Sequence, residues 1–123
     1  MENKEKPCTC YSGDNLVIAC SGAADVGYLS DQVARRLSRN KVIKMSCLAL
    51  VASCSDEKIN EFKQNNFLVI DGCSEDCGKR IMEQKGISDY NYLRITDLGY
   101  EKGKTPTDQK TVKAIYEKAE VNF

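Results

Sequence analysis

The stretch Leu16-Val17-Ile18-Ala19-Cys20-Ser21-Gly22-Ala23-Ala24-Asp25-Val26 joins a short apolar run to a turn of small residues and then to the start of a helical pattern. Three further apolar runs start near Val42, Phe67 and Tyr92, at intervals long enough for a strand, a helix and two short loops. Repetition of this unit predicts an α/β fold, a three-layer sandwich with a mostly parallel four-stranded sheet. The simplest strand order is the Rossmann-like 2-1-3-4. The ligand crevice is then expected between the turns at Cys20 and Cys73, where the strand order reverses.

Helical patterns fill the intervals between the runs. Residues 25–39 form the strongest one, because Val26, Leu29, Val33 and Leu37 line one face at steps of three and four. Three more helices are predicted over residues 53–64, over residues 74–85 and after Pro106, with Ser53, Ser74 and Thr107 as their respective N-caps. Residues 1–14 are expected to be a flexible N-terminal segment, and residues 15–123 a single domain.

Composition excludes several classes of partner. Lysine and arginine number 18 together, as do aspartate and glutamate, so no field of one sign would attract nucleic acid or an anionic membrane. No apolar stretch approaches the roughly 20 residues that a membrane-spanning helix needs. The first residues are polar and lack the apolar centre of a signal peptide, which favours a cytoplasmic location.

The cysteine content points to metal or redox chemistry. The chain has seven cysteines and no histidine. In a cytoplasmic protein, cysteines more often bind metal or react than form structural disulfides. The absence of histidine excludes mixed cysteine and histidine zinc sites as well as histidine general-base catalysis. Any metal ion must therefore be held mainly by thiolates.

Four cysteines are predicted to meet at one edge of the sheet. Cys20, Cys47 and Cys73 each stand at, or just after, the C-terminal end of an apolar run, and Cys77 follows Cys73 by four residues. Cys77 falls in the first turn of a predicted helix, where free amide N–H groups favour a thiolate. Four thiolates in a tetrahedron are a common ligand set for Zn²⁺. The alternative for Cys20 and Cys47 is that they are small buried hydrophobic residues.

Other polar and sulfur-bearing positions are less specific. Cys8 and Cys10 fit equally well as extra ligands on a flexible arm and as part of a solvated tail. Cys54 fits as a spare ligand or as a buried cysteine. Asp71 is predicted to form a turn, with hydrogen bonds to loop amides or support of the metal site as alternatives. The turn at residues 20–28 lacks the lysine of a Walker loop and the arginine of a phosphatase loop, which favours a close-packed turn over an anion site.

Four segments carry a family resemblance: Ala19-Cys20-Ser21-Gly22-Ala23-Ala24-Asp25-Val26-Gly27, Met45-Ser46-Cys47-Leu48-Ala49, Val69-Ile70-Asp71-Gly72-Cys73 with Cys77, and Ile95-Thr96-Asp97-Leu98-Gly99. Together they resemble the DGC-domain family, small proteins that are described as zinc-binding and are named after an Asp-Gly-Cys motif. The resemblance covers roughly residues 16–103. It implies that the chelating cysteines are Cys20, Cys47, Cys73 and Cys77, and it implies no particular reaction.

The sequence thus predicts a zinc-binding protein with a four-cysteine site at the C-terminal edge of the sheet. A site formed by loops at this edge suits metal carriage or sensing. One alternative is a thiol redox or sulfur-transfer enzyme, in which Cys20 or Cys73 is the nucleophile and Cys77 resolves the intermediate. The other is an iron–sulfur protein, because four thiolates also bind a cluster. Whether the protein is an enzyme stays open at this point.

Overall fold

A computed structural model describes residues 14–40 and 43–121 of the chain. Its strands are β1 (Asn15–Ala19), β2 (Lys44–Cys47), β3 (Asn66–Asp71) and β4 (Asn91–Arg94). They form one parallel sheet in the order β2-β1-β3-β4, which confirms the predicted order. Apart from Asp14, the predicted N-terminal segment lies outside the described residues, as do Cys8, Cys10 and Val42.

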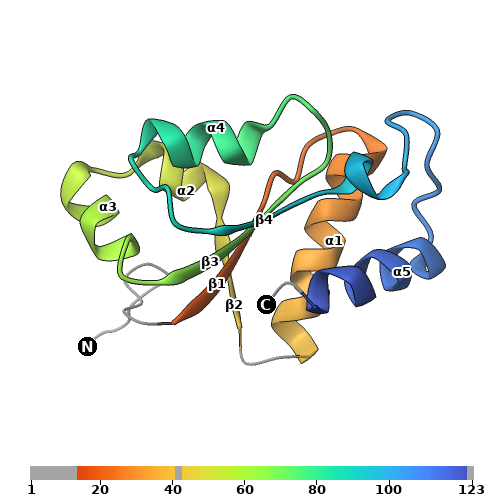
Figure 1. The fold of residues 1–123 in the computed structure, drawn as a ribbon, viewed down its shortest axis with the longest axis horizontal. Coiled ribbons are helices and arrows are strands. Elements are labelled where there is room, and N and C mark those ends of the chain that lie inside the picture. The colour runs from red at the N-terminus through yellow and green to blue at the C-terminus, as the bar shows by residue number, and fades with distance from the viewer. Residues whose placement is uncertain (1–13, 41–42, 122–123) are drawn as a thin grey trace.

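Helices cover both faces of this sheet, as a three-layer sandwich requires (Figure 1). On one face lie α1 (Asp25–Asn40) and α5 (Gln109–Glu120), and on the other lie α2 (Leu48–Ser53), α3 (Asp56–Phe62) and α4 (Cys77–Gln84). A short 3₁₀ helix, η1 (Ile95–Leu98), follows β4. Within the described ranges, no helix is both long and apolar enough to cross a membrane.

The strands are buried on both sides, which explains their continuous apolar runs. In β1, Val17 packs toward α1 and α5, whereas Leu16 and Ile18 pack toward the opposite helices, and all three are fully buried. The predicted stripe of α1 is buried as well. Further apolar side chains in or next to the strands are buried too: Ile43, Leu68, Ile70, Leu93 and Ile95.

The second predicted helix is wrong in its bounds, because two helices occupy this region. Residues 48–53 form α2 directly after β2, and α3 begins at Asp56. The cap is Ser55, whose hydroxyl accepts a hydrogen bond from the Lys58 amide at 3.3 Å. Ser53 cannot cap α3, since it is itself the last residue of α2.

Two other predicted caps are also displaced toward the C-terminus. The helix expected from Ser74 begins at Cys77, because residues 72–76 form a turn in which the Asp76 amide donates to the Cys73 carbonyl at 3.1 Å. The last helix begins at Gln109 and not directly after Thr107. Its cap is Asp108, whose carboxylate accepts from the Thr111 amide at 2.9 Å.

The loop after β3 and the turn after β1 each pack closely against the backbone at the start of α1, in the region where the crevice was expected. A Cβ on Gly72 would lie 2.8 Å from the carbonyl carbon of Val26, and a Cβ on Gly27 would lie 2.8 Å from the backbone of Gly22. These loops therefore touch backbone to backbone, which only glycine allows. A cleft of about 570 Å³ lies on the other side of β1, beside Cys20 and Cys47.

Candidate functional site

All four predicted ligand cysteines lie at the C-terminal edge of the sheet or on the helix that follows it. Cys20 comes directly after β1, Cys47 is the last residue of β2, Cys73 follows β3 by two residues, and Cys77 is the first residue of α4. Cys47 and Cys77 are exposed, whereas Cys20 and Cys73 are partly buried. The edge therefore presents two accessible thiols and two sheltered ones.

Cys20 is held by the sheet and by α1. Its amide donates to the Ile70 carbonyl at 3.0 Å, which extends the β1–β3 pairing by one bond. Its sulfur lies 3.2 Å from the hydroxyl of Ser30, which is fully buried on α1. The Ser30 hydroxyl donates to the Gly27 carbonyl at 2.8 Å, so the neutral Cys20 thiol is the donor in the contact between them.

Two of the other thiols affect the pKa of the Cys77 thiol. Burial raises the pKa of the Cys77 thiol, and the negative charges of Cys20, Asp71 and Cys73 raise it further. The positive charge of the exposed Arg80 lowers the pKa of Cys77, and it is the smallest of these effects. Such coupling requires short separations, because charges at a surface are screened within about 10 Å. Cys20 and Cys73 are thus the two other predicted ligands whose charges act on Cys77.

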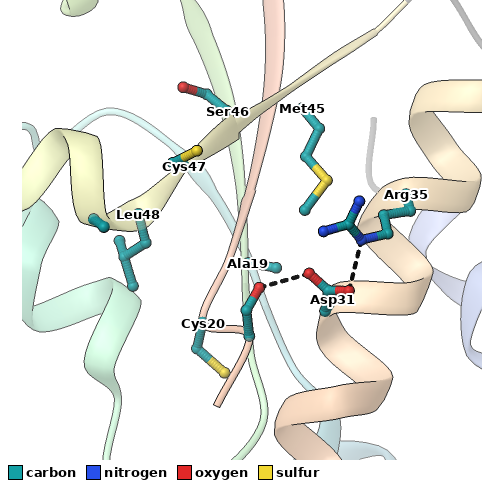
Figure 2. Close-up of a pocket in the computed structure, with 10 residues that line it drawn as sticks. Ala19, Cys20, Asp31, Arg35, Met45, Ser46, Cys47 and Leu48 are labelled. Carbon is teal, nitrogen blue, oxygen red and sulfur yellow. Dashed lines mark hydrogen bonds and ion pairs between the residues drawn. The ribbon is translucent and has the colours of Figure 1, made fainter.

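Cys47 belongs to a different environment, the cleft beside β1. Its nearby charge helps to raise the pKa of Arg35, although the ion pair of Arg35 with Asp31, at 2.7 Å, is the main cause. Figure 2 shows Cys20 and Cys47 at separate ends of the cleft, with Asp31 and Arg35 along one wall. The lining residues are Ala19, Cys20, Ser21, Asp31, Arg35, Met45, Ser46, Cys47, Leu48 and Ala49.

No preformed metal centre is present among the residues that the structure describes. In residues 14–40 and 43–121, no three cysteine, aspartate or glutamate side chains are arranged to hold an ion. The charges of Cys20 and Cys73 act on the Cys77 thiol, whereas Cys47 lies at the other end of the cleft from Cys20. The four-cysteine ligand set thus stays a prediction.

Asp71, the aspartate of the Asp-Gly-Cys motif, caps helix α4. It is 1% exposed, and its two carboxylate oxygens accept hydrogen bonds from the amides of Gly78 at 2.8 Å and Lys79 at 3.0 Å. This confirms the alternative of hydrogen bonds to amides over that of a simple turn former. A side chain at position 78 would collide with this carboxylate, because a Cβ there would lie 2.7 Å from Asp71 Oδ1.

Sequence reasoning missed two residues of β4 that contact this turn. The Tyr92 hydroxyl lies 2.8 Å from Asp71 and 3.0 Å from Asp76, and Arg94 forms a bidentate ion pair with Asp76. Burial is the main cause that raises the pKa of Tyr92, and the hydrogen bond to Asp76 is the main cause that raises that of Arg94. Their spacing of two residues, which puts both side chains on one face of a strand, is the signal that could have found them.

Packing decides between the two predictions for Cys54. The Cys54 thiol donates to the Val51 carbonyl at 3.6 Å and packs against the core on the α2 side, which favours the buried cysteine over a spare ligand. Asp97 lies in η1 and pairs with Arg94 at 3.2 Å.

The protein is a parallel α/β domain with four cysteines at the C-terminal edge of the sheet or at the start of α4. Comparison with known families then identifies it: residues 16–119 match the DGC domain, and the chain belongs to the DGC-domain family. The anaerobic and virulence modulator AnvM of Pseudomonas aeruginosa is 30% identical over 88 residues, which are 71% of this chain and 67% of AnvM. No solved structure matches the chain significantly.

Proposed function

We propose that this protein binds Zn²⁺ through Cys20, Cys47, Cys73 and Cys77 and serves to carry or sense the metal. The proposal is supported by the placement of all four cysteines at the C-terminal edge of the sheet or at the start of α4. In addition, the charges of Cys20 and Cys73 help to raise the pKa of Cys77. A divalent cation among them would reverse this effect, since it stabilises every coordinating thiolate.

The donor set suits zinc in its chemistry. Thiolates are soft ligands that favour Zn²⁺ over Mg²⁺ or Ca²⁺, and four of them meet its usual coordination number. Cys47 would supply the fourth sulfur from the end of β2. Its exposure, and that of Cys77, would leave the metal open to exchange with another molecule. Such a site suits a carrier or a sensor better than a permanently buried structural zinc.

The relative AnvM is named an anaerobic and virulence modulator. A protein that senses a metal ion or an oxidant can act as a modulator by changing state when its signal is present. If this chain has a similar role, sensing is favoured over simple carriage. Thiolate sites respond both to metal supply and to oxidation, which links such a role to the cysteines.

Metal analysis of the full chain, purified without oxygen or chelators, tests the proposal. We expect one zinc per chain and a colourless solution. Changing both Cys73 and Cys77 to serine should abolish tight binding, whereas Cys54→Ser, a matched change outside the ligand set, should retain it. Visible absorbance from bound iron would instead identify an iron–sulfur protein. Tight stoichiometric binding by the double variant would contradict the ligand assignment and make Cys8 and Cys10 the candidates.

The cleft beside Cys20 favours a second candidate, a thiol redox enzyme. Its volume of about 570 Å³ is within the range of small-molecule sites, and the Arg35 guanidinium lies on its wall. The Cys20 thiolate would attack one sulfur of a small disulfide, form a mixed disulfide and release one thiolate. Cys77 would then attack the Cys20 sulfur and release the second thiolate, which leaves a Cys20–Cys77 disulfide.

Peptide mapping separates this candidate from zinc binding. Metal-free protein would be treated with a small symmetrical disulfide and digested without reduction. A redox enzyme predicts a Cys20–Cys77 disulfide, which Cys77→Ser would replace by a stable mixed disulfide on Cys20. If Cys20 is unmodified while the exposed Cys47 reacts, the redox candidate is wrong.

A further inference from the structure

We propose that Tyr92 and Arg94 are positioning residues of the thiol site, and that they fix the turn between Cys73 and Cys77. We call these two residues, together with their partners Asp71 and Asp76, the β4 clamp. The link from the clamp to metal binding rests on the proposed function. The link from the clamp to the geometry of the thiols does not, and it can be tested separately.

The turn contains a residue in an unfavourable conformation. Asp76 has φ of 55°, in the left-handed region, and it stands immediately before Cys77. This conformation is unfavourable for residues other than glycine, although aspartate adopts it more readily than most. Other interactions must therefore stabilise Asp76, or the turn would relax and Cys77 would change direction.

Arg94 provides the main stabilising contact. Its Nη2 lies 2.6 Å from Oδ1 and 2.7 Å from Oδ2 of Asp76, and its Nε lies 2.8 Å from Oδ1. Both side chains are only 21% exposed, so water and salt screen this pair less than a surface ion pair. The planar fork of arginine sets the orientation of the carboxylate as well as its position.

Tyr92 joins this ion pair to the helix cap. Its hydroxyl lies between Asp71 Oδ2 and Asp76 Oδ1, although it has only one hydrogen to donate. Asp71 in turn receives the amides of Gly78 and Lys79 at the start of α4. Tyr92 and Arg94 both lie on β4. Through them the sheet holds Asp71 before the turn and Asp76 at its end. The direction of the Cys77 thiol thus depends on two side chains outside the cysteine motif.

The first experiment measures zinc affinity by competition with a chelating dye. The variants are Tyr92→Phe and Arg94→Gln, and the control is Arg39→Gln, which removes an exposed guanidinium from the last turn of α1. We expect affinity to fall about 10–100-fold in the two clamp variants, the usual effect of losing residues that orient metal ligands. The control should bind as wild type does. Arg94→Lys should rescue only partly, because lysine keeps the charge but cannot form the bidentate pair.

The second experiment needs no zinc. A trivalent phenylarsenical binds two thiols only when they can reach the same arsenic atom, so its capture by metal-free protein reports the mutual position of Cys20, Cys73 and Cys77. We expect weaker capture in Arg94→Gln and Tyr92→Phe than in wild type and in Arg39→Gln. Both experiments are performed well below the melting temperature of every variant, so that lower stability alone leaves the results unchanged.

The two experiments fail in different ways. If wild type does not bind zinc but the clamp variants capture the arsenical less well, the proposed function is wrong and the clamp is supported. If the folded clamp variants match wild type in both experiments, the clamp proposal is wrong. Should Arg94→Gln fail to fold, Tyr92→Phe decides alone, because it removes a single oxygen and keeps the ring in place.

Discussion

Gly72 brings the loop that carries Cys73 against the backbone of α1. Because a Cβ at this position would lie 2.8 Å from Val26 and 2.9 Å from Gly27, the loop must move if any side chain is introduced. We therefore expect Gly72→Ala to lower the free energy of unfolding by about 1–3 kcal/mol, as overpacking does in other cores. Urea denaturation at neutral pH measures this difference.

Gly22 is the matched control for this change. It stands in the facing turn, yet nothing lies within 4 Å of a Cβ built on it. Gly22→Ala should change stability by no more than about 0.5 kcal/mol. Equal effects of the two substitutions would mean that glycine matters here through chain entropy and not through close approach.

The sequence pattern predicted that the cysteines lie at the edge of the sheet. It did not predict which side chains fix the turn between Cys73 and Cys77. The apolar runs position Cys20, Cys47 and Cys73, because the C-terminal ends of parallel strands meet at one edge. Tyr92 and Arg94 were not predicted, since their role depends on Asp76, sixteen and eighteen residues away in sequence. Such contacts appear only once β4 is placed next to β3.

Helix α3 begins after the cap Ser55, whereas the sequence pattern predicted Ser53 as the cap. Ser53 and Ser55 both precede an acidic residue, but only the Ser55 hydroxyl accepts from an amide of the first turn. Ser55→Ala should therefore cost about 1 kcal/mol of stability, a typical value for the loss of an N-cap. Thermal unfolding followed by circular dichroism provides the measurement.

Ser53→Ala is the control in the same segment. Ser53 is exposed at the end of α2, so its substitution should leave the melting temperature almost unchanged. A larger loss from Ser53→Ala than from Ser55→Ala would contradict the cap and support the helix bounds that the sequence predicted.

Elements were predictable where their pattern is long. The sixteen residues of α1 show a full helical stripe, and its predicted start at Asp25 is confirmed. Helix α2 has six residues, LALVAS, and five of them are apolar, so no periodicity distinguishes it from a continuing strand. Ends of helices were displaced wherever several serine, threonine or aspartate residues offered alternative caps.

Asp25 connects α1 to a loop far away in sequence and makes the stability of the whole molecule depend on pH. Its carboxylate accepts from the amides of Val26, Gly103 and Thr105, at 2.8, 2.9 and 3.0 Å. The bonds from Gly103 and then Thr105 are the main causes that lower its pKa below the ordinary 3.8. A lowered pKa in the folded state means that this stabilisation is complete above the ordinary pKa and is lost as the pH falls through the lower, folded value.

We therefore expect Asp25→Asn to reduce the dependence of stability on pH below about pH 4. The measurement is a series of urea denaturations from neutral pH to about pH 2, and Asp89→Asn, at an exposed position before β4, is the control. Wild type and the control should lose more free energy of unfolding over this range than Asp25→Asn. An identical slope in all three proteins would exclude Asp25 as a source of acid sensitivity.

The fold as a whole should not depend on metal. Its two cores, one on each face of the sheet, consist mainly of buried aliphatic side chains, and among the four proposed ligands only Cys73 packs against either core. Zinc would therefore stabilise the protein only by linkage, RT ln(1 + [L]/Kd), about 2.7 kcal/mol at a hundredfold excess over Kd. Changing Cys73 and Cys77 to serine should leave a cooperatively folded protein whose melting temperature no longer rises with added zinc, while that of wild type still does. If the double variant is unfolded at room temperature, zinc would be a structural element, as in a zinc finger, and carriage or sensing would lose its main support.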